Sequence, residues 1–295
     1  MDTDWAIIAE AVRAQGGVDI DPERRQPVGG GCINEAWRVE GDPAPVFVKR
    51  NRGALADMFE AEAEGLRAIV DSDSVRAPRP LCTGVAGSRA FLVLEYLPFG
   101  HGTGSAQAIL GRQLAAMHRA TAPAFGWHRD NTIGSTPQVN DWTPDWVAFL
   151  RVHRLGYQYE LAAANGFGGE LTRLGERLLA LLDGFFTDHR PQPSLLHGDL
   201  WSGNQGVLAS GEPVIFDPAT YYGDREADLA MTELFGGFGA DFHAAYREAW
   251  PLDAGYEVRK VLYNLYHILN HLNLFGGGYH GQALSMTRRL LAELG

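Results

Sequence analysis

Cysteine and long hydrophobic runs are scarce in this chain of 295 residues. Its two cysteines, Cys32 and Cys82, cannot build a disulfide framework, so we expect a reducing, cytoplasmic environment. No apolar run approaches the roughly 20 residues that a membrane-spanning helix needs, and acidic residues near the N-terminus argue against a signal peptide. With a net charge of −11, the chain is not expected to have the basic face that is typical of nucleic-acid-binding proteins. We therefore expect a globular protein with neither nucleic acid nor membrane as partner.

Lysine is the scarcest charged residue. Of the 25 basic residues, only Lys49 and Lys260 are lysines. Such a skew usually reflects genome composition, so a lysine in apolar surroundings is conspicuous. Lys49 ends the run Val46-Phe47-Val48, which has the pattern of a buried strand. Lys49 is therefore a candidate functional residue.

The first hundred residues combine helical and strand-like patterns. Apolar residues recur at helical spacing over two segments, and short runs rich in β-formers predict strands. The expected elements are a helix over 4–15, strands at 36–39 and 46–49, a helix over 55–70 and a strand over 89–97. The turn Pro98-Phe99-Gly100 ends the last strand.

After this turn the pattern becomes helical. The expected helices cover 106–120, 143–163 and 171–186, and one β-rich patch at 195–216 interrupts the series. This order predicts an α+β chain of two lobes: a small β-rich N-terminal lobe over 1–97 and a larger, mostly helical C-terminal lobe over 98–295. A cleft between lobes is a common place for a ligand.

The strongest chemical signal is the octapeptide His197-Gly198-Asp199-Leu200-Trp201-Ser202-Gly203-Asn204. Kinase catalytic loops place an aspartate, which accepts the proton of the substrate hydroxyl, five residues before an asparagine that binds Mg²⁺. Asp199 and Asn204 have this spacing. Asp217 then ends the strand-like run Val214-Ile215-Phe216, where a second metal ligand belongs. Each aspartate alone would more often cap a turn or end a strand, but their joint spacing favours a kinase site.

The first lobe is expected to bind the nucleotide. Lys49 would contact the phosphates, and of three glutamates on the following helix, Glu62 lies beside the packed face and would pair with it. A glycine-rich turn would let backbone N–H groups approach the phosphates, and two residues at the lobe boundary would hydrogen-bond adenine through their backbone. These are Gly29, Gly30 and Gly31 in the turn, and Glu95 and Leu97 at the boundary.

The octapeptide resembles the signature of the fructosamine kinase (ketosamine 3-kinase) family. This family is a branch of the aminoglycoside and choline kinase group, which has a bilobal protein-kinase-like fold. Further segments resemble the family in the same order along the chain: 31–35, 46–49, 58–62, 137–142, 217–219, 235–238 and 270–273. The resemblance therefore covers nearly the whole sequence.

The resemblance implies an ATP-dependent, Mg²⁺-requiring kinase that phosphorylates the 3-hydroxyl of a fructosamine or ribulosamine in protein deglycation repair. The acceptor would be a free or a protein-bound ketosamine. The implied roles are contact with the ATP phosphates for Lys49, an ion pair with that lysine for Glu62, catalytic base for Asp199, metal ligands for Asn204 and Asp217, and a place beside the sugar for Trp201. Pro218-Ala219 follows Asp217 where protein kinases have Phe-Gly, so we expect no mobile activation segment.

Two other functions remain open. A small-molecule kinase of the same fold could act on an aminoglycoside, choline or a similar alcohol, although that wider group often has histidine where Trp201 stands. A catalytically dead nucleotide-binding protein is less consistent with the sequence, because such proteins usually lack the base or a metal ligand. Both are present here.

For several further residues, the sequence allows a structural or a functional role. Cys32, in the glycine-rich turn, either simply fits the turn or makes the chain a redox-sensitive homodimer rather than a monomer. His197 is expected to brace the catalytic loop. Asp224 and Asp228 are expected to cap or brace the following helix. Trp142 and Trp146 are expected to lie in the core.

Overall fold

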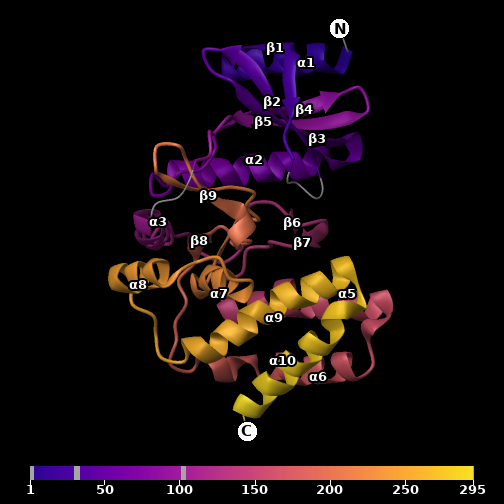
Figure 1. The fold of residues 1–295 in the computed structure, drawn as a ribbon. Coiled ribbons are helices and arrows are strands. Elements are labelled where there is room, and N and C mark those ends of the chain that lie inside the picture. Colours follow the sequence, from indigo (N-terminus) through magenta and orange to yellow (C-terminus); the bar gives the residue numbers. More distant parts are fainter. Residues whose placement is uncertain (1–2, 30–33, 101–103, 295) are drawn as a thin grey trace. The chain divides into compact units, whose positions relative to one another are not determined.

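The structure, a computed structural model, describes residues 3–29, 34–100 and 104–294 (Figure 1). The chain forms two compact units. The first consists of Met1–Ala106 and Gln205–Pro218, and the second of Gln107–Asn204 and Ala219–Gly295. In the described part of the chain, no helix is both long enough and apolar enough to cross a membrane.

A five-stranded antiparallel sheet forms the centre of the first unit (Figure 1). Its strand order is β1-β2-β3-β5-β4, with β1 at Asp19–Pro27, β2 at Glu35–Asp42, β3 at Val46–Arg52, β5 at Arg89–Glu95 and β4 at Pro80–Ala86. The strands predicted at 36–39, 46–49 and 89–97 are confirmed as β2, β3 and β5.

The strands β1 and β4 were not predicted, because neither has a clear apolar pattern. β1 is largely polar, and its pairing with β2 shifts register between Asp21 and Arg25. β4 begins at a proline and contains Gly84, over which the ring of Phe91 from β5 lies so closely that a Cβ would meet it at 2.7 Å. Pairing with neighbouring strands, rather than local propensity, makes these segments extended.

Two helices pack on this sheet. α1 (Thr3–Ala11), continued by a π-helical stretch at Val12–Gly16, contacts β4 and β1, and α2 (Ala56–Asp71) contacts β4 and β5. Every residue of β5 from Ala90 to Leu94 is buried, as in a strand covered on both faces. Trp5 and Ile8 of α1 join Val48, Phe91 and Val93 in the core.

The first unit also contains a hairpin from the middle of the sequence. β9 (Gln205–Val207) pairs antiparallel with β10 (Pro213–Ile215), so the predicted β-rich patch is confirmed. Val214 forms a bridge to Arg76, and the ring of Phe99 lies 5.5 Å from that of Phe216. These contacts explain why 98–106 and 205–218 group with the first unit, whereas the sequence pattern placed them in the C-terminal lobe.

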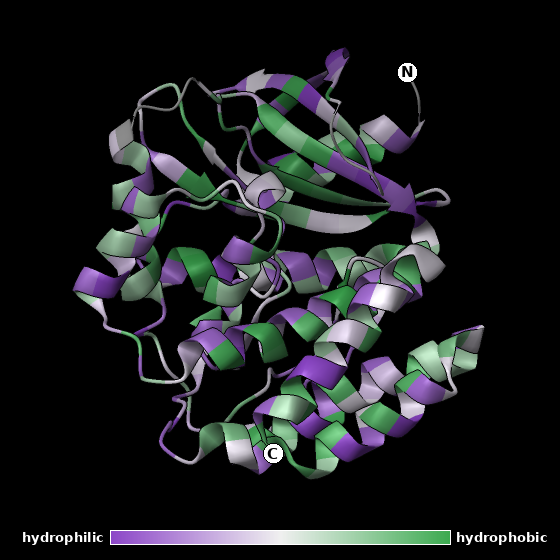
Figure 2. Cartoon of the chain, turned by 60° about the horizontal axis from the view of Figure 1, so that its bottom comes forward, coloured by the Kyte–Doolittle hydropathy of each residue, from purple (hydrophilic) through white to green (hydrophobic). Residues whose placement is uncertain are grey.

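The second unit is mostly helical, and its amphipathic helices show alternating hydrophilic and hydrophobic bands (Figure 2). α9 is largely buried and packs against α5, α7 and α10. The α-helices are α3 (Gly104–Met117, which begins at the end of the first unit), α4 (Trp146–Phe149), α5 (Tyr157–Ala162), α6 (Glu170–Ala180), α7 (Glu226–Leu234), α8 (Ala240–Ala249), α9 (Tyr256–Phe275) and α10 (His280–Glu293).

Two pairs of short strands complete the second unit. β6 (Asn131–Ile133) pairs with β7 (Thr136–Gln138), and β8 (Ser194–Leu196) pairs with β11 (Tyr221–Gly223). The helix predicted over 143–163 is divided by a π-helical turn at Leu150–Gly156, and the one over 171–186 ends as a 3₁₀ helix. The predicted α+β class, with a β-rich first part and a helical second part, is confirmed.

Candidate active site

Lys49 lies on β3 with its side chain almost fully buried, and it forms two ion pairs. Its Nζ lies 2.6 Å from Oε1 of Glu62 on α2 and 2.5 Å from Oδ1 of Asp217. Burial by itself lowers the pKa of Lys49, but the charges of Asp217 and Glu62 outweigh it and raise that pKa above its ordinary value. Lys49 is therefore a cation held in one place by two carboxylates.

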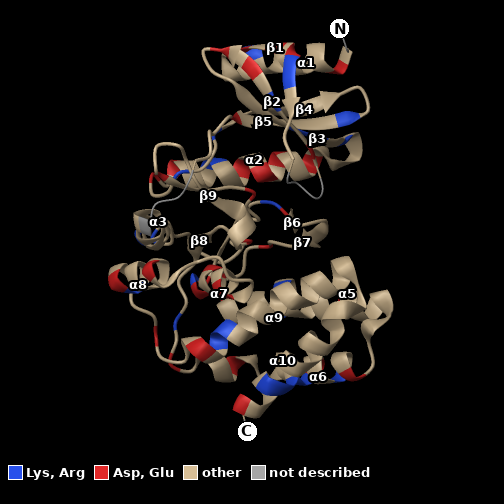
Figure 3. Cartoon of the chain, viewed as in Figure 1, with Lys and Arg blue, Asp and Glu red and all other residues tan. Residues whose placement is uncertain are grey.

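Acidic residues follow one another along α2 (Figure 3). Among them, Glu60 is exposed, whereas the side chain of Glu62 is 12% exposed and reaches Lys49. The predicted choice of Glu62 as ion-pair partner agrees with this geometry. Its part in nucleotide binding stays a prediction.

Asp217 has an unusual backbone conformation. Its φ of 56° lies in the left-handed region, which residues with a Cβ rarely adopt. A residue held in this way costs on the order of 1–3 kcal/mol, and such residues cluster at functional sites. Its side chain is 46% exposed although Oδ1 contacts Lys49. Asp217 follows β10 at the position predicted for a metal ligand.

The loop with the octapeptide belongs to the second unit and follows β8. Nδ2 of Asn204 donates a hydrogen bond to the backbone oxygen of Asp199 at 2.9 Å and lies 3.4 Å from its Oδ2. Because the amide nitrogen of Asn204 faces Asp199, its amide oxygen points in a different direction. The two residues predicted from their five-residue spacing are thus in direct contact.

The carboxylate of Asp228 on α7 accepts hydrogen bonds from the backbone of this loop. Its Oδ2 accepts the N–H of His197 at 2.7 Å, and its Oδ1 accepts the N–H of Gly198 at 2.8 Å. Nε2 of His118 lies 3.1 Å from the same carboxylate. Burial works against the charged form, but the hydrogen bond and electrostatic interaction with His118 and the hydrogen bond from the Gly198 backbone help to outweigh it and lower the pKa of Asp228. A buried carboxylate therefore fixes the residues before Asp199.

Gly198 is required at its position in the loop. Its φ is 82°, and a Cβ there would lie 2.1 Å from the backbone oxygen of Ala219. The N–H of Ala219 in turn donates to the oxygen of His197 at 2.8 Å. This loop, which we call the catalytic loop after its predicted role, therefore touches the segment that follows Asp217 in the sequence.

His197 and Asp224 have the structural roles that were predicted for them, whereas Asp228 does not. Nδ1 of the buried His197 accepts the N–H of Asp199 at 3.2 Å and so braces the loop. Oδ1 of Asp224 accepts the N–H of Glu226 at 3.1 Å where α7 begins. Asp228 was expected to cap or brace the following helix, but it lies within α7 and its hydrogen bonds join the loop at His197 and Gly198, a contact that sequence spacing cannot reveal.

The tryptophans divide between surface and core. Trp201 is 40% exposed, and its ring lies over Gly203, where a Cβ would meet it at 2.2 Å. Trp146 is buried, as predicted. The same prediction was wrong for Trp142, which is 48% exposed and stacks on Tyr222 with ring centroids 6.2 Å apart.

Of the remaining predicted nucleotide contacts, Gly29, Glu95 and Leu97 lie within the described residues. Gly29 is exposed after β1, and Gly30, Gly31 and Cys32 lie outside the described residues. Glu95 ends β5, where its N–H donates to the oxygen of Arg79 at 2.9 Å and its carboxylate pairs with Arg76. Leu97 follows β5 in a segment without regular secondary structure. The predicted adenine contacts of Glu95 and Leu97 stay predictions.

Comparison with known proteins decides the family. Residues 4–293 match the family described as fructosamine kinase. The chain belongs to the fructosamine kinase family. A probable ketoamine kinase of Synechocystis is 48% identical over 289 residues, 97% of each chain. A protein-ribulosamine 3-kinase of Arabidopsis thaliana is 46% identical over 270 residues, 90% of this chain and 82% of the plant protein. The predicted family and the predicted enzyme class, a phosphotransferase, are confirmed.

Solved structures of fructosamine kinase relatives have the same fold. A fructosamine-3-kinase candidate from Thermobifida fusca superposes with a TM-score of 0.86 at 32% identity and covers 97% of this chain and 98% of its own. The aminoglycoside phosphotransferase APH(2'')-Ib reaches a TM-score of 0.64 at 13% identity, with 100% and 99% covered. At that identity the likeness concerns the fold alone. It confirms the predicted kinase-like fold.

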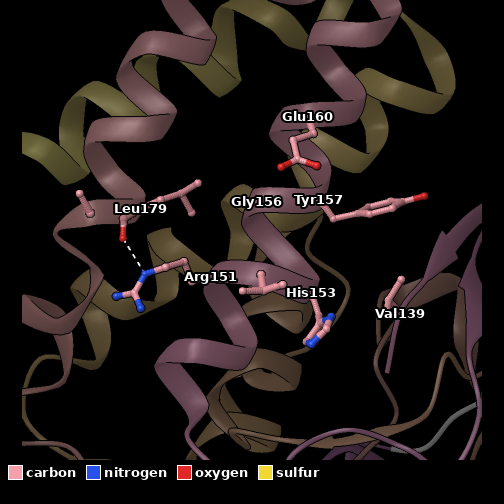
Figure 4. A pocket seen from close by; sticks show the side chains of 9 residues that line it. Val139, Arg151, His153, Gly156, Tyr157, Glu160 and Leu179 are labelled. Carbon is pink, nitrogen blue, oxygen red and sulfur yellow. Dashed lines mark hydrogen bonds between the residues drawn. The ribbon is translucent and has the colours of Figure 1, made fainter. Parts of the chain in front are cut away.

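One surface pocket of this fructosamine kinase family member lies apart from the predicted site residues. It has a volume of about 450 Å³ and lies beside the π-helical turn at Leu150–Gly156 (Figure 4). The guanidinium of Arg151, which lines the pocket, has partners within the protein. Its Nε donates to the oxygen of Leu179 at 2.9 Å, and its Nη2 donates to Asp183 at 2.6 Å. None of the predicted site residues lines it, so we assign the pocket no part in the chemistry.

Proposed function

We propose that this kinase transfers the γ-phosphate of ATP to the 3-hydroxyl of a ketosamine, a fructosamine or ribulosamine. The observation that carries the proposal is the 45–48% identity, over at least nine-tenths of the chain, to proteins named ketoamine kinase or protein-ribulosamine 3-kinase. ATP as donor is supported by fold relatives solved with ADP. The reaction belongs to deglycation repair, because the phosphorylated adduct then decomposes, and we place it in the cytoplasm.

The nucleotide phosphates are assigned to the first unit. The ammonium of Lys49 would contact phosphate oxygens, and its ion pairs with Glu62 and Asp217 fix the position of the ammonium. The buried position supports this role, because an ion pair excluded from water is stronger and less mobile than one on the surface. The glycine-rich turn would add backbone N–H groups to the same phosphates.

Asn204 and Asp217 fit Mg²⁺. The ion prefers oxygen ligands and needs only one or two carboxylates beside phosphates and waters. Asp217 offers a half-exposed carboxylate, and Asn204 offers an amide oxygen turned away from the nitrogen that contacts Asp199. When bound, Mg²⁺ neutralises negative charge on the transferring phosphoryl group.

The acceptor is assigned to the catalytic loop. Asp199 would accept the proton of the 3-hydroxyl as that oxygen attacks phosphorus, because an aspartate at this point of the loop is the base of kinases. The exposed ring of Trp201, two residues away, would pack against the C–H face of the sugar. The close packing of the Trp201 ring on Gly203 supports this role, because a ring that packs against a sugar must keep a fixed orientation.

The test is ATP consumption with Mg²⁺ against a panel of fructosyl- and ribulosyl-amines, an aminoglycoside and choline. We expect turnover of at least one ketosamine and loss of about 10²-fold or more in kcat for Asp199→Asn, with ATP affinity nearly unchanged, because general-base catalysis typically contributes 10²–10⁴-fold. Turnover of the aminoglycoside or choline alone would reject the ketosamine assignment. Absence of any turnover, with nucleotide still bound, would indicate a nucleotide-binding protein without catalysis.

A further inference from the structure

A cluster of buried polar side chains surrounds the β6–β7 pair, and no step of the proposed reaction uses it. We call Asn131, Gln138, Asn140 and Arg154 the β6–β7 cluster. Two of its members come from the segment 137–142, which resembles the fructosamine kinase family but has had no role so far. Gln138, Asn140 and Arg154 are each 1% exposed. Groups this deeply buried must be satisfied within the protein.

The cluster is internally hydrogen-bonded. Oδ1 of Asn131 accepts from Nε2 of Gln138 at 2.8 Å and from Nδ2 of Asn140 at 2.9 Å. Oδ1 of Asn140 accepts from Nη2 of Arg154 at 2.7 Å. Within the described residues, no carboxylate pairs with this guanidinium, which instead donates to two backbone oxygens and lies 4.0 Å from the ring centre of Tyr221. The side chains therefore hold one another in fixed orientations.

Two further donors of this cluster are aimed at two successive backbone carbonyls. Nε2 of Gln138 donates to the oxygen of Ala219 at 3.2 Å, and Nδ2 of Asn131 donates to the oxygen of Thr220 at 2.8 Å. Oε1 of Gln138 accepts the hydroxyl of Tyr266 at 2.7 Å, which orients the amide so that its nitrogen faces Ala219. Both carbonyls belong to the segment directly after Asp217-Pro218.

This segment is also held on its other side. The N–H of Ala219 donates to His197 in the catalytic loop at 2.8 Å, and Tyr221 pairs with Leu196 in β11 and β8. Protein kinases have a mobile activation segment at this place in the sequence. Here the backbone at 219–220 is fixed from two directions. Removing a donor would leave a buried carbonyl unsatisfied, which is costly.

We propose that Asn131 and Gln138 are positioning residues: they fix the chain immediately after the metal ligand Asp217 and thereby set the geometry for Mg²⁺ and phosphoryl transfer. This inference rests on the proposed function for the identity of the metal ligand. The two amides touch neither nucleotide nor acceptor in this assignment. They act through the backbone of Ala219 and Thr220.

The test compares Gln138→Met and Asn131→Asp with the matched control Thr287→Val. Gln138→Met keeps the length of the side chain without its hydrogen-bonding groups, and Asn131→Asp removes the donor to Thr220 while keeping the shape. Thr287 is also fully buried, but its hydroxyl hydrogen-bonds Tyr159 and the backbone oxygen of Ala283. The readouts are binding of a non-hydrolysable ATP analogue as a function of Mg²⁺ concentration, hydrogen exchange of peptides spanning 217–223, and kcat against KM for a ketosamine.

Both cluster variants are expected to need about 10-fold more Mg²⁺ for half-maximal analogue binding and to exchange faster at 217–223. We expect kcat to fall by up to about 10²-fold with little change in KM for the acceptor, since small misplacements of reacting groups can cost that much. The control should keep wild-type values in all three. Cluster variants that lose thermal stability but keep wild-type Mg²⁺ dependence and exchange would overturn the proposal. The binding and exchange measurements need no acceptor, so they test it even if the ketosamine assignment fails.

Discussion

At the scale of single residues, Lys49 is the clearest case of a side chain whose chemistry matters beyond its charge. It is one of two lysines in the chain, and it is buried between two carboxylates. An ammonium is a compact charge that can contact phosphate oxygens at a point, whereas a guanidinium is a wide planar fork. The ion pairs with Glu62 and Asp217 leave little room for that fork.

Lys49→Arg should therefore lower kcat/KM for ATP by about 10²-fold, because displacement of the bound phosphates by even about 1 Å can have this effect. Steady-state ATP consumption measures it, with circular dichroism to show that the variant is folded. Lys260→Arg is the matched control, since Lys260 pairs with Glu233 and Glu257 away from the proposed site. A fully active Lys49→Arg enzyme would remove Lys49 from the phosphate site.

Cys32 is a second residue whose environment, a glycine-rich turn proposed to bind phosphate, matters for its reactivity. We expect mild peroxide treatment to produce a Cys32–Cys32 linked dimer of reduced activity that dithiothreitol reverses, because a positive local field favours the thiolate. Cys82 is an internal comparison: it is buried, and burial raises its pKa to about 11. Non-reducing electrophoresis of wild type and Cys32→Ser is the measurement. A dimer that persists in Cys32→Ser, or no dimer in either protein, contradicts the idea.

At the scale of elements, α7 and the catalytic loop are joined through one carboxylate. Asp228 accepts two backbone N–H groups of the loop and contacts His118. Because these partners favour the charged form, the pKa of Asp228 is lower in the folded than in the unfolded protein. A lowered folded pKa means that the stabilisation is present above the unfolded pKa, near 4, and is lost as the pH falls through the folded value.

Asp228→Asn should reduce the free energy of unfolding by about 1–3 kcal/mol at pH 7, the cost of leaving a buried donor unsatisfied. The difference from wild type should be constant between about pH 7 and 5 and shrink below about pH 4. Urea unfolding followed by tryptophan fluorescence at pH 7, 5 and 3.5 measures it. Asp183→Asn, which removes an exposed partner of Arg151, is a control with an expected effect below about 1 kcal/mol. A difference that grows towards acid pH would be inconsistent with this assignment.

At the scale of the whole molecule, nucleotide binding should be linked to stability. A ligand that binds only the folded state at about 100 times its Kd adds about 2.7 kcal/mol to the free energy of unfolding. For a chain of this size that corresponds to a rise in Tm of roughly 4 °C or more. Differential scanning fluorimetry with a non-hydrolysable ATP analogue and Mg²⁺ measures the rise.

Asp217→Ala should abolish most of this rise, and EDTA should do the same to wild type, because both would remove the Mg²⁺ that we propose to accompany the nucleotide. Asp199→Asn should retain the rise, since Asp199 is assigned to the acceptor and not to the nucleotide. Equal shifts in Asp217→Ala and wild type would show that Asp217 does not hold the metal.

Much of the first unit and the ion pair between Lys49 and Glu62 could be predicted because their signals are local in sequence. The spacing from Asp199 to Asn204 and Asp217 reflects one loop and one hairpin, and helical spacing on α2 was enough to single out Glu62. The strands β1 and β4 were missed because their extended form depends on pairing with β2 and β5, and polar or glycine-containing segments have no pattern of their own that shows it.

The contacts that hold the catalytic loop have no such local signal. Asp228 lies 30 residues after Gly198 and accepts its backbone N–H. Gln138 lies 81 residues before Ala219 and donates to its backbone oxygen. The residues proposed for the chemistry lie in short stretches of the chain, so their types and spacings are visible in the sequence. The hydrogen bonds that fix those stretches join remote segments, and which polar groups meet depends on how the helices of the second unit pack.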